Sequence, residues 1–156
     1  MTRVGCLALV LAALLLGGCD VMGSSKNTVA PKPLSHAEFV RRANHICTVS
    51  QRRAQRLKKP VTSHAVLVRR LNYAVRVFEQ DIVAFRRLTP PVADAPAFGR
   101  LIADLDAEDV NAHRLVDAIE AGQRGRARTL GKKLDHLDKS LKRRSINLGL
   151  RICAKD

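Results

Sequence analysis

The chain contains few aromatic residues: one tyrosine, four phenylalanines and no tryptophan among 156 residues. Glycine is rare within the main body, and the few prolines stand in clusters. This composition disfavours β-sheet and favours helices. Because base-stacking side chains are scarce, nucleic acid is an unlikely partner, even though the formal net charge is +14.

Motifs of catalysis are also lacking. The sequence contains no nucleophile motif, no glycine-rich phosphate-binding loop and no closely spaced set of metal ligands. The five histidines are scattered singly. We therefore expect a protein that is not an enzyme and that needs no cofactor.

Only one long uncharged apolar run is present, residues 5–16, and it is too short to span a bilayer as a stable helix. It follows Arg3 and ends in Leu16-Gly17-Gly18-Cys19, which gives it the layout of a secretory signal. Its end resembles the bacterial lipobox. That resemblance implies cleavage after Gly18 and attachment of a diacylglyceryl group to the sulfur of Cys19. The alternative is a plain signal peptide with an incidental cysteine.

Two acyl chains on Cys19 would anchor the protein stably, whereas a single chain binds membranes only marginally. We therefore expect a lipid-anchored protein on the extracytoplasmic face of the cell membrane. Residues 1–18 form the signal peptide in this interpretation. Residues 19–34 are the lipidated cysteine and a flexible linker rich in Gly, Ser and Pro, and residues 35–156 are the folded domain.

The sequence predicts four amphipathic helices in this domain. The first helix begins at a Ser35–Glu38 capping box and ends before Pro60. The second begins at Thr62 or Ser63 and ends at Thr89-Pro90-Pro91, and the third runs from Asp94 to Gly122. The fourth begins near Gly125, and its apolar stripe continues to Ile152. The stripes repeat with an average period near 3.6 residues, which favours nearly straight helices. The short links between them predict an up-down-up-down four-helix bundle.

In such a bundle the first and last helices lie antiparallel and side by side. Cys47 in the first helix and Cys153 at the end of the last helix are an even pair outside the cytoplasm, and we expect them to form a disulfide. Two buried free thiols are the alternative. We expect Asn44, beside Cys47, to make a structural hydrogen bond.

Several short motifs resemble those of small actinobacterial lipoproteins of uncharacterised function. They are Phe39-x3-Ala43-Asn44-x-Ile46-Cys47, Leu88-Thr89-Pro90-Pro91, Ala121-Gly122 and Ile152-Cys153. The resemblance covers most of the mature chain and implies a helical, disulfide-closed, membrane-anchored domain. It implies no catalytic residues.

Positive charge concentrates near the end of the first helix and the start of the fourth. These cations are Arg52, Arg53, Arg56, Lys58, Lys59, Arg124, Arg126, Arg128, Lys132 and Lys133. The expected bundle brings the two groups together as one basic pole, which would attract anionic lipids or wall polymers. The alternative is an ordinary solvated surface in an arginine-rich protein.

One pair of residues suggests a different site. Asp109 falls on the apolar stripe of the third helix, and His113 lies one turn further on nearly the same face. The pair could supply two metal ligands inside a bundle, or it could be a satisfied polar pair at the edge of the core. The two functional hypotheses are thus a non-enzymatic binding or scaffolding lipoprotein with a basic surface, and a small-ligand or metal carrier that uses the bundle interior. The sequence does not identify a partner protein.

Overall fold

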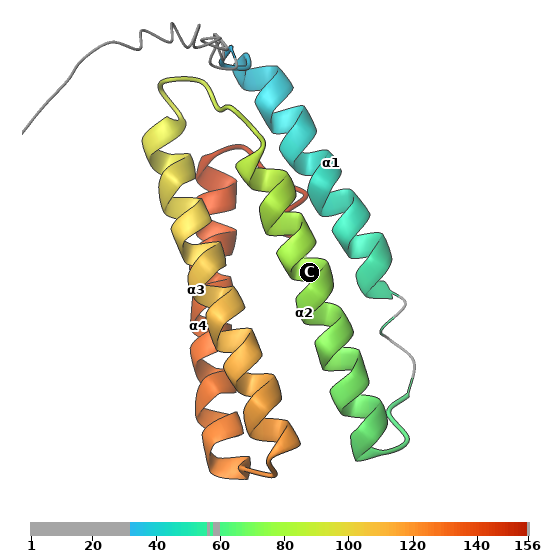
Figure 1. The fold of residues 1–156 in the computed structure, drawn as a ribbon. Coiled ribbons are helices and arrows are strands. Elements are labelled where there is room, and N and C mark those ends of the chain that lie inside the picture. Colours follow the sequence, from blue (N-terminus) through green and yellow to red (C-terminus); the bar gives the residue numbers. More distant parts are fainter. Residues whose placement is uncertain (1–31, 56, 58–59, 156) are drawn as a thin grey trace, which may run out of the picture. The chain divides into compact units, whose positions relative to one another are not determined.

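The computed structural model describes residues 32–55, 57 and 60–155 of the chain, which form four helices and, within these ranges, no strand. The helices are α1 (His36–Gln55), α2 (His64–Arg86), α3 (Ala95–Glu120) and α4 (Arg124–Asn147) (Figure 1). The prediction of an all-α, four-helix fold is confirmed. The predicted signal peptide and Cys19 lie outside the described residues, as do Arg56, Lys58 and Lys59.

The helix starts follow local capping chemistry. The side chain of Ser35 accepts a hydrogen bond from the backbone N–H of Glu38, and that of Ser63 accepts one from the backbone N–H of Val66. Asp94 occupies the N-cap of α3, but its carboxylate makes no capping bond. It accepts a hydrogen bond from the ring of His36 instead, at 2.7 Å between Nδ1 and Oδ2. The predicted capping role of the Asp94 side chain is therefore wrong.

Two glycines with positive φ end the last two helices. Gly122 (φ 66°) follows α3, as predicted, and Gly149 (φ 77°) follows α4. In the second turn the backbone N–H of Leu150 donates to the carbonyl of Ser145, which is the pattern of a Schellman motif. The prediction that helix 4 continues to Ile152 is wrong, because the chain reverses at Gly149.

Helices adjacent in sequence pack as antiparallel pairs. Arg53 of α1 approaches Gln80 of α2, and Asn72 of α2 bonds Glu120 of α3. Ser140 of α4 bonds Asp104 of α3. The backbones of α1 and α4 make no close approach within the described residues (Figure 1). The expectation that the first and last helices lie side by side is therefore wrong.

The C-terminal segment that follows α4, and not α4 itself, contacts α1. Cys153 in this segment forms a disulfide with Cys47 of α1, with the two Cα atoms 5.1 Å apart. The disulfide prediction is confirmed. Asn44 has the structural role that we expected, since its side-chain oxygen accepts a hydrogen bond from the backbone N–H of Ile152 at 3.0 Å.

The hydrophobic core lies at the end of the domain where this segment crosses α1. Phe39 and Leu150 are fully buried there, and Phe39 meets Phe98 edge-on at 5.1 Å between ring centroids. Phe85 lies 6.5 Å from Phe98. All four helices and the C-terminal segment thus contribute buried apolar side chains to one core.

Candidate functional site

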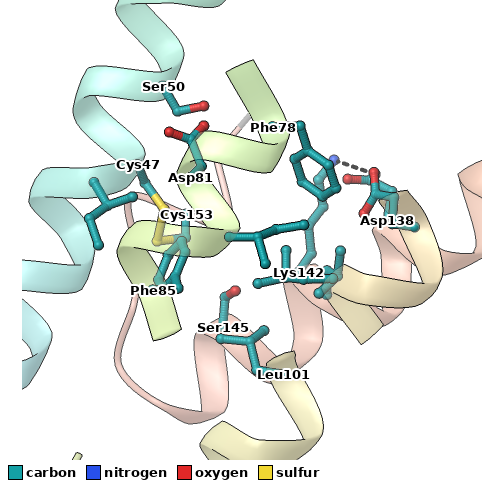
Figure 2. Close-up of a pocket in the computed structure, with 15 residues that line it drawn as sticks. Cys47, Ser50, Phe78, Asp81, Phe85, Leu101, Asp138, Lys142, Ser145 and Cys153 are labelled. Atoms are coloured by element: carbon teal, nitrogen blue, oxygen red, sulfur yellow. Dashed lines mark ion pairs between the residues drawn. A yellow bond between two sulfur atoms is a disulfide. The ribbon is translucent and has the colours of Figure 1, made fainter. Parts of the chain in front are cut away.

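A cavity of about 170 Å³ lies beside the disulfide, lined by residues of all four helices (Figure 2). Cys47 and Ser50 of α1 face it together with Cys153. On the other side Leu141 and Ser145 of α4 contribute to its wall. The cavity thus has walls from both α1 and α4, whose backbones do not approach each other within the described residues.

Most of the cavity wall is apolar. It includes the rings of Phe78 and Phe85 from α2 and the side chains of Leu101 and Leu105 from α3 (Figure 2). Ser145 is buried among these groups and is much smaller than the leucines around it. Small side chains on inward-facing positions leave volume that larger ones would fill.

Asp81 of α2 is the most buried charged residue of the wall, with only 7% of its surface exposed. Ser50 and Arg53 are the groups that favour the charged form of its carboxylate, and Arg53 Nη1 lies 3.9 Å from Oδ1. The second oxygen, Oδ2, is buried and has no hydrogen-bond partner among the described residues. Burial raises the pKa of Asp81, because the charged form has lost most of its hydration.

Glu108 of α3 is the second acidic group of the wall. Its burial, together with the negative charge of Asp138, raises its pKa from 4.5 to about 7. Asp138 is half-exposed and forms an ion pair with Lys142, at 3.1 Å between Nζ and Oδ2 (Figure 2). Three carboxyl groups and one ammonium group therefore line a cavity that is otherwise mainly apolar.

The sequence contains a pattern that points to this cavity, although neither of the two predicted sites, the basic pole and the Asp109–His113 pair, lies there. Asp81 stands three residues after Phe78 and four before Phe85, so it shares their inward face on α2. Ser50 and Ser145 also fall on inward-facing stripes. An acid and two serines on such positions indicate a polar cavity, but no spacing within one helix shows that they converge from separate helices.

The pair Asp109 and His113 lies elsewhere, between α2 and α3. Glu79 of α2 joins it, with His113 Nε2 2.9 Å from Glu79 Oε1 and 3.9 Å from Asp109 Oδ1. The three side chains are 45% (Glu79), 24% (Asp109) and 51% (His113) exposed. Asp109 Oδ1 is buried, whereas His113 is half exposed, so the pair lies at the edge of the core, as the second alternative had it, and not inside the bundle. The ligand atoms lie within 4.8 Å of one another, but exposed groups of this kind also form simple ion pairs.

The predicted basic residues are divided between two places. Arg53 lies beside Gln80, whereas Arg124 lines a surface pocket with His64, at the start of α2. At 1.5 Å per residue, these two points are about 24 Å apart along the axis of α2. Arg53 and Arg124 therefore do not lie together, and the pole as a whole stays a prediction, because Arg56, Lys58 and Lys59 lie outside the described residues.

Comparison of the chain with models of protein families, with curated proteins and with solved structures finds no match. Among the described residues, no helix combines the length and the apolar character that crossing a membrane requires. The geometry of the cavity is thus the main structural guide to function.

Proposed function

We propose that this protein is a non-enzymatic binding module, anchored by a lipid on Cys19 to the extracytoplasmic face of the cell membrane, and that its small ligand occupies the cavity beside the disulfide. The lipobox-like sequence and the resemblance to small actinobacterial lipoproteins support the anchor. The Cys47–Cys153 disulfide is in keeping with an oxidising compartment.

The observation that carries the proposed binding function is the cavity itself. Its volume of about 170 Å³ is close to that of a cavity, roughly 150 Å³, that holds one benzene molecule. Its wall combines apolar side chains with a few polar groups, as small-molecule sites do. The described lining residues include no histidine, and both cysteines are joined to each other, which supports binding rather than covalent catalysis.

The binding function can be tested with two water-soluble probes of equal length, 1-butanol and n-butylammonium. We expect at least one to cause saturable shifts of the methyl signals of Leu101, Leu105 and Leu141 in the full-length protein in detergent. The substitution Ser145→Leu fills the cavity and should abolish these shifts, whereas Thr129→Leu adds the same side chain on an exposed part of α4. If neither probe shifts the three leucines, or if Ser145→Leu leaves the shifts unchanged, the proposal is wrong.

The anchor is tested separately. Replacement of Cys19 by Ala removes the thiol that would carry the lipid, so it should abolish labelling by a clickable fatty acid and release or mis-process the protein. Undiminished labelling of this variant would contradict lipid attachment at Cys19. The cavity proposal does not depend on that result.

A basic surface that binds anionic lipids or wall polymers is a second candidate function. It is favoured by the first ten residues of α4, which contain five exposed cations with no carboxylate partner among the described residues: Arg124, Arg126, Arg128, Lys132 and Lys133. These residues form a basic segment of one helix, which we call the α4 basic segment. It is the half of the predicted pole whose five cations all lie within the described residues.

A further inference from the structure

The charges around the cavity indicate which chemical class of ligand it takes, if the proposed binding function is correct. Asp81, Glu108 and Asp138 supply three carboxyl groups, and Lys142 supplies one ammonium group, which is paired with Asp138. Binding an anion would place a further negative group beside Asp81 and Glu108. The charge of the wall therefore favours a cation.

Asp81 is the group that requires such a ligand most. A buried carboxylate oxygen is stable only when a donor or a positive charge compensates for its lost hydration. Ser50 and Arg53 both act on the carboxylate, but Arg53 is 3.9 Å from Oδ1, and Oδ2 has no partner among the described residues. A positively charged ligand in the cavity would compensate for the lost hydration of this carboxylate.

The geometry distinguishes an organic cation from a metal ion. A metal requires several ligand atoms that converge on one point. In the described part of the chain, the group that meets this condition is Glu79, Asp109 and His113, not the carboxylates of the cavity. The rest of the wall is mainly apolar and includes two aromatic rings, Phe78 and Phe85, which suit an alkyl chain and attract a cation.

We infer that the cavity binds a small primary amine in its ammonium form, with the ammonium group facing the carboxyl groups of Asp81 and Glu108 and the alkyl chain lying against Phe78 and Phe85. A primary ammonium has three donors and no acceptor, which matches a site rich in carboxylate oxygens. The cavity volume suits a ligand, or the part of a ligand that enters it, of about the size of benzene.

Glu108 gives this inference a second measurable consequence. With its pKa raised to about 7, part of the Glu108 population is protonated near neutral pH. An ammonium group bound nearby favours the ionised form and should displace that proton. Asp81, Asp138 and Lys142 line the same cavity, so the proton has to be assigned by substitution.

The experiment compares n-butylammonium with 1-butanol at pH 7 by calorimetry and by the leucine methyl shifts, with the full-length protein in detergent. We expect the ammonium to bind at least tenfold more tightly than the alcohol and to release a proton, seen as a dependence of the binding heat on the buffer. Asp81→Asn should remove the tenfold preference, and Glu108→Gln should remove the proton release. Asp106→Asn, which neutralises an exposed acid paired with Arg86, is the matched control and should change neither.

The outcomes separate this inference from the proposed function. If the two probes bind equally well, the cavity is an apolar site and the inference is wrong, while the proposed binding function stands. The same conclusion follows if Asp81→Asn behaves like Asp106→Asn. If neither probe enters the cavity, both are wrong. Because the comparison of probes uses the unmodified protein, it decides the matter even if Asp81→Asn does not fold.

Discussion

The side-chain oxygen of Asn44 accepts a hydrogen bond from the backbone N–H of Ile152, one residue before the disulfide cysteine Cys153. A second side chain of α1 acts on the same segment, since Gln51 Nε2 donates to the carbonyl of Ile152 at 2.9 Å. These two bonds attach the C-terminal segment to α1 through the N–H and the carbonyl of Ile152. They position Cys153 next to Cys47, which lies between Asn44 and Gln51 on the helix.

We predict that reduction of the Cys47–Cys153 disulfide strongly destabilises the fold. The bond joins residues 106 apart in sequence, and for a loop of that length the chain-entropy model gives about 4–5 kcal/mol, as an upper value. Urea unfolding of oxidised and reduced protein measures the difference. Asn44→Ala, which removes one hydrogen bond and leaves the disulfide, should cost only about 1 kcal/mol. Equal stability of the oxidised and reduced proteins would refute the prediction.

Glu108 should make the free energy of unfolding decrease as the pH rises from about 4.5 to about 7. In this range unfolded Glu108 releases its proton at its ordinary pKa of 4.5, while folded Glu108 holds it until the pH reaches about 7. Below this range both states are protonated, and above it both are ionised, so the contribution is constant. Glu108→Gln removes this contribution.

Urea unfolding of both proteins at pH 4.5, 6 and 7.5 tests the Glu108 prediction. Other titrating groups are common to the two proteins, so the difference between their stabilities is the quantity to follow. It should grow in favour of Glu108→Gln by about 1–2 kcal/mol across this range, after allowance for the partial exposure of Glu108. A difference that stays constant with pH would show that Glu108 titrates normally.

Most of the fold followed from local sequence signals. Ser35, Ser63 and Gly122 act as cap or turn residues where the sequence predicted them, because each role depends on neighbours within a few positions. The early end of α4 was missed because the apolar stripe continues through Leu148 and Ile152. The apolar stripe predicts a helix that continues past Gly149. In the structure the helix ends before Gly149, and the segment after it packs against α1.

The candidate site was much less predictable than the fold. Asp109 interrupts an apolar stripe, which predicts a position in the bundle interior, but α2 covers that position only in part. Asp81 lies on the inward face of α2 in the sequence pattern, but nothing in the sequence shows that Glu108 of α3 lines the same cavity. The cavity depends on the separation of α1 from α4, and no helical period encodes that separation.

Two glycines should respond to alanine in opposite directions. Gly131 lies within α4, and a Cβ atom there would meet nothing within 4 Å, so Gly131→Ala should stabilise the protein by about 0.5–1 kcal/mol. Gly149 has φ 77°, and its Cβ would lie 3.5 Å from Val40 Cγ2. Gly149→Ala should therefore destabilise it by about 1–2 kcal/mol. Thermal melting compares the variants, and a stabilising Gly149→Ala would contradict the left-handed turn.

The α4 basic segment, Arg124 to Lys133, should bind anionic surfaces more strongly than the basic residues near the start of α1. Arg128 and Lys132 have no carboxylate partner among the described residues, whereas Arg41 and Arg42 both pair with Glu38, at 2.7 and 2.6 Å. These ion pairs lower the pKa of Glu38 to about 2, so it stays ionised and offsets their charge at neutral pH.

Two double variants with the same change in net charge test this difference, Arg128→Glu with Lys132→Glu and Arg41→Glu with Arg42→Glu. The protein carries Cys19→Ala in both, so that no acyl chain contributes to binding. Co-sedimentation with phosphatidylglycerol vesicles should fall further in the first variant than in the second. Binding of the parent protein should also weaken as salt shortens the screening length from about 10 Å at 0.1 M to about 3 Å at 1 M. Equal losses in the two variants would mean that bulk charge alone drives binding, and a parent protein that does not bind the vesicles at low salt would exclude anionic lipids as the ligand of this second function.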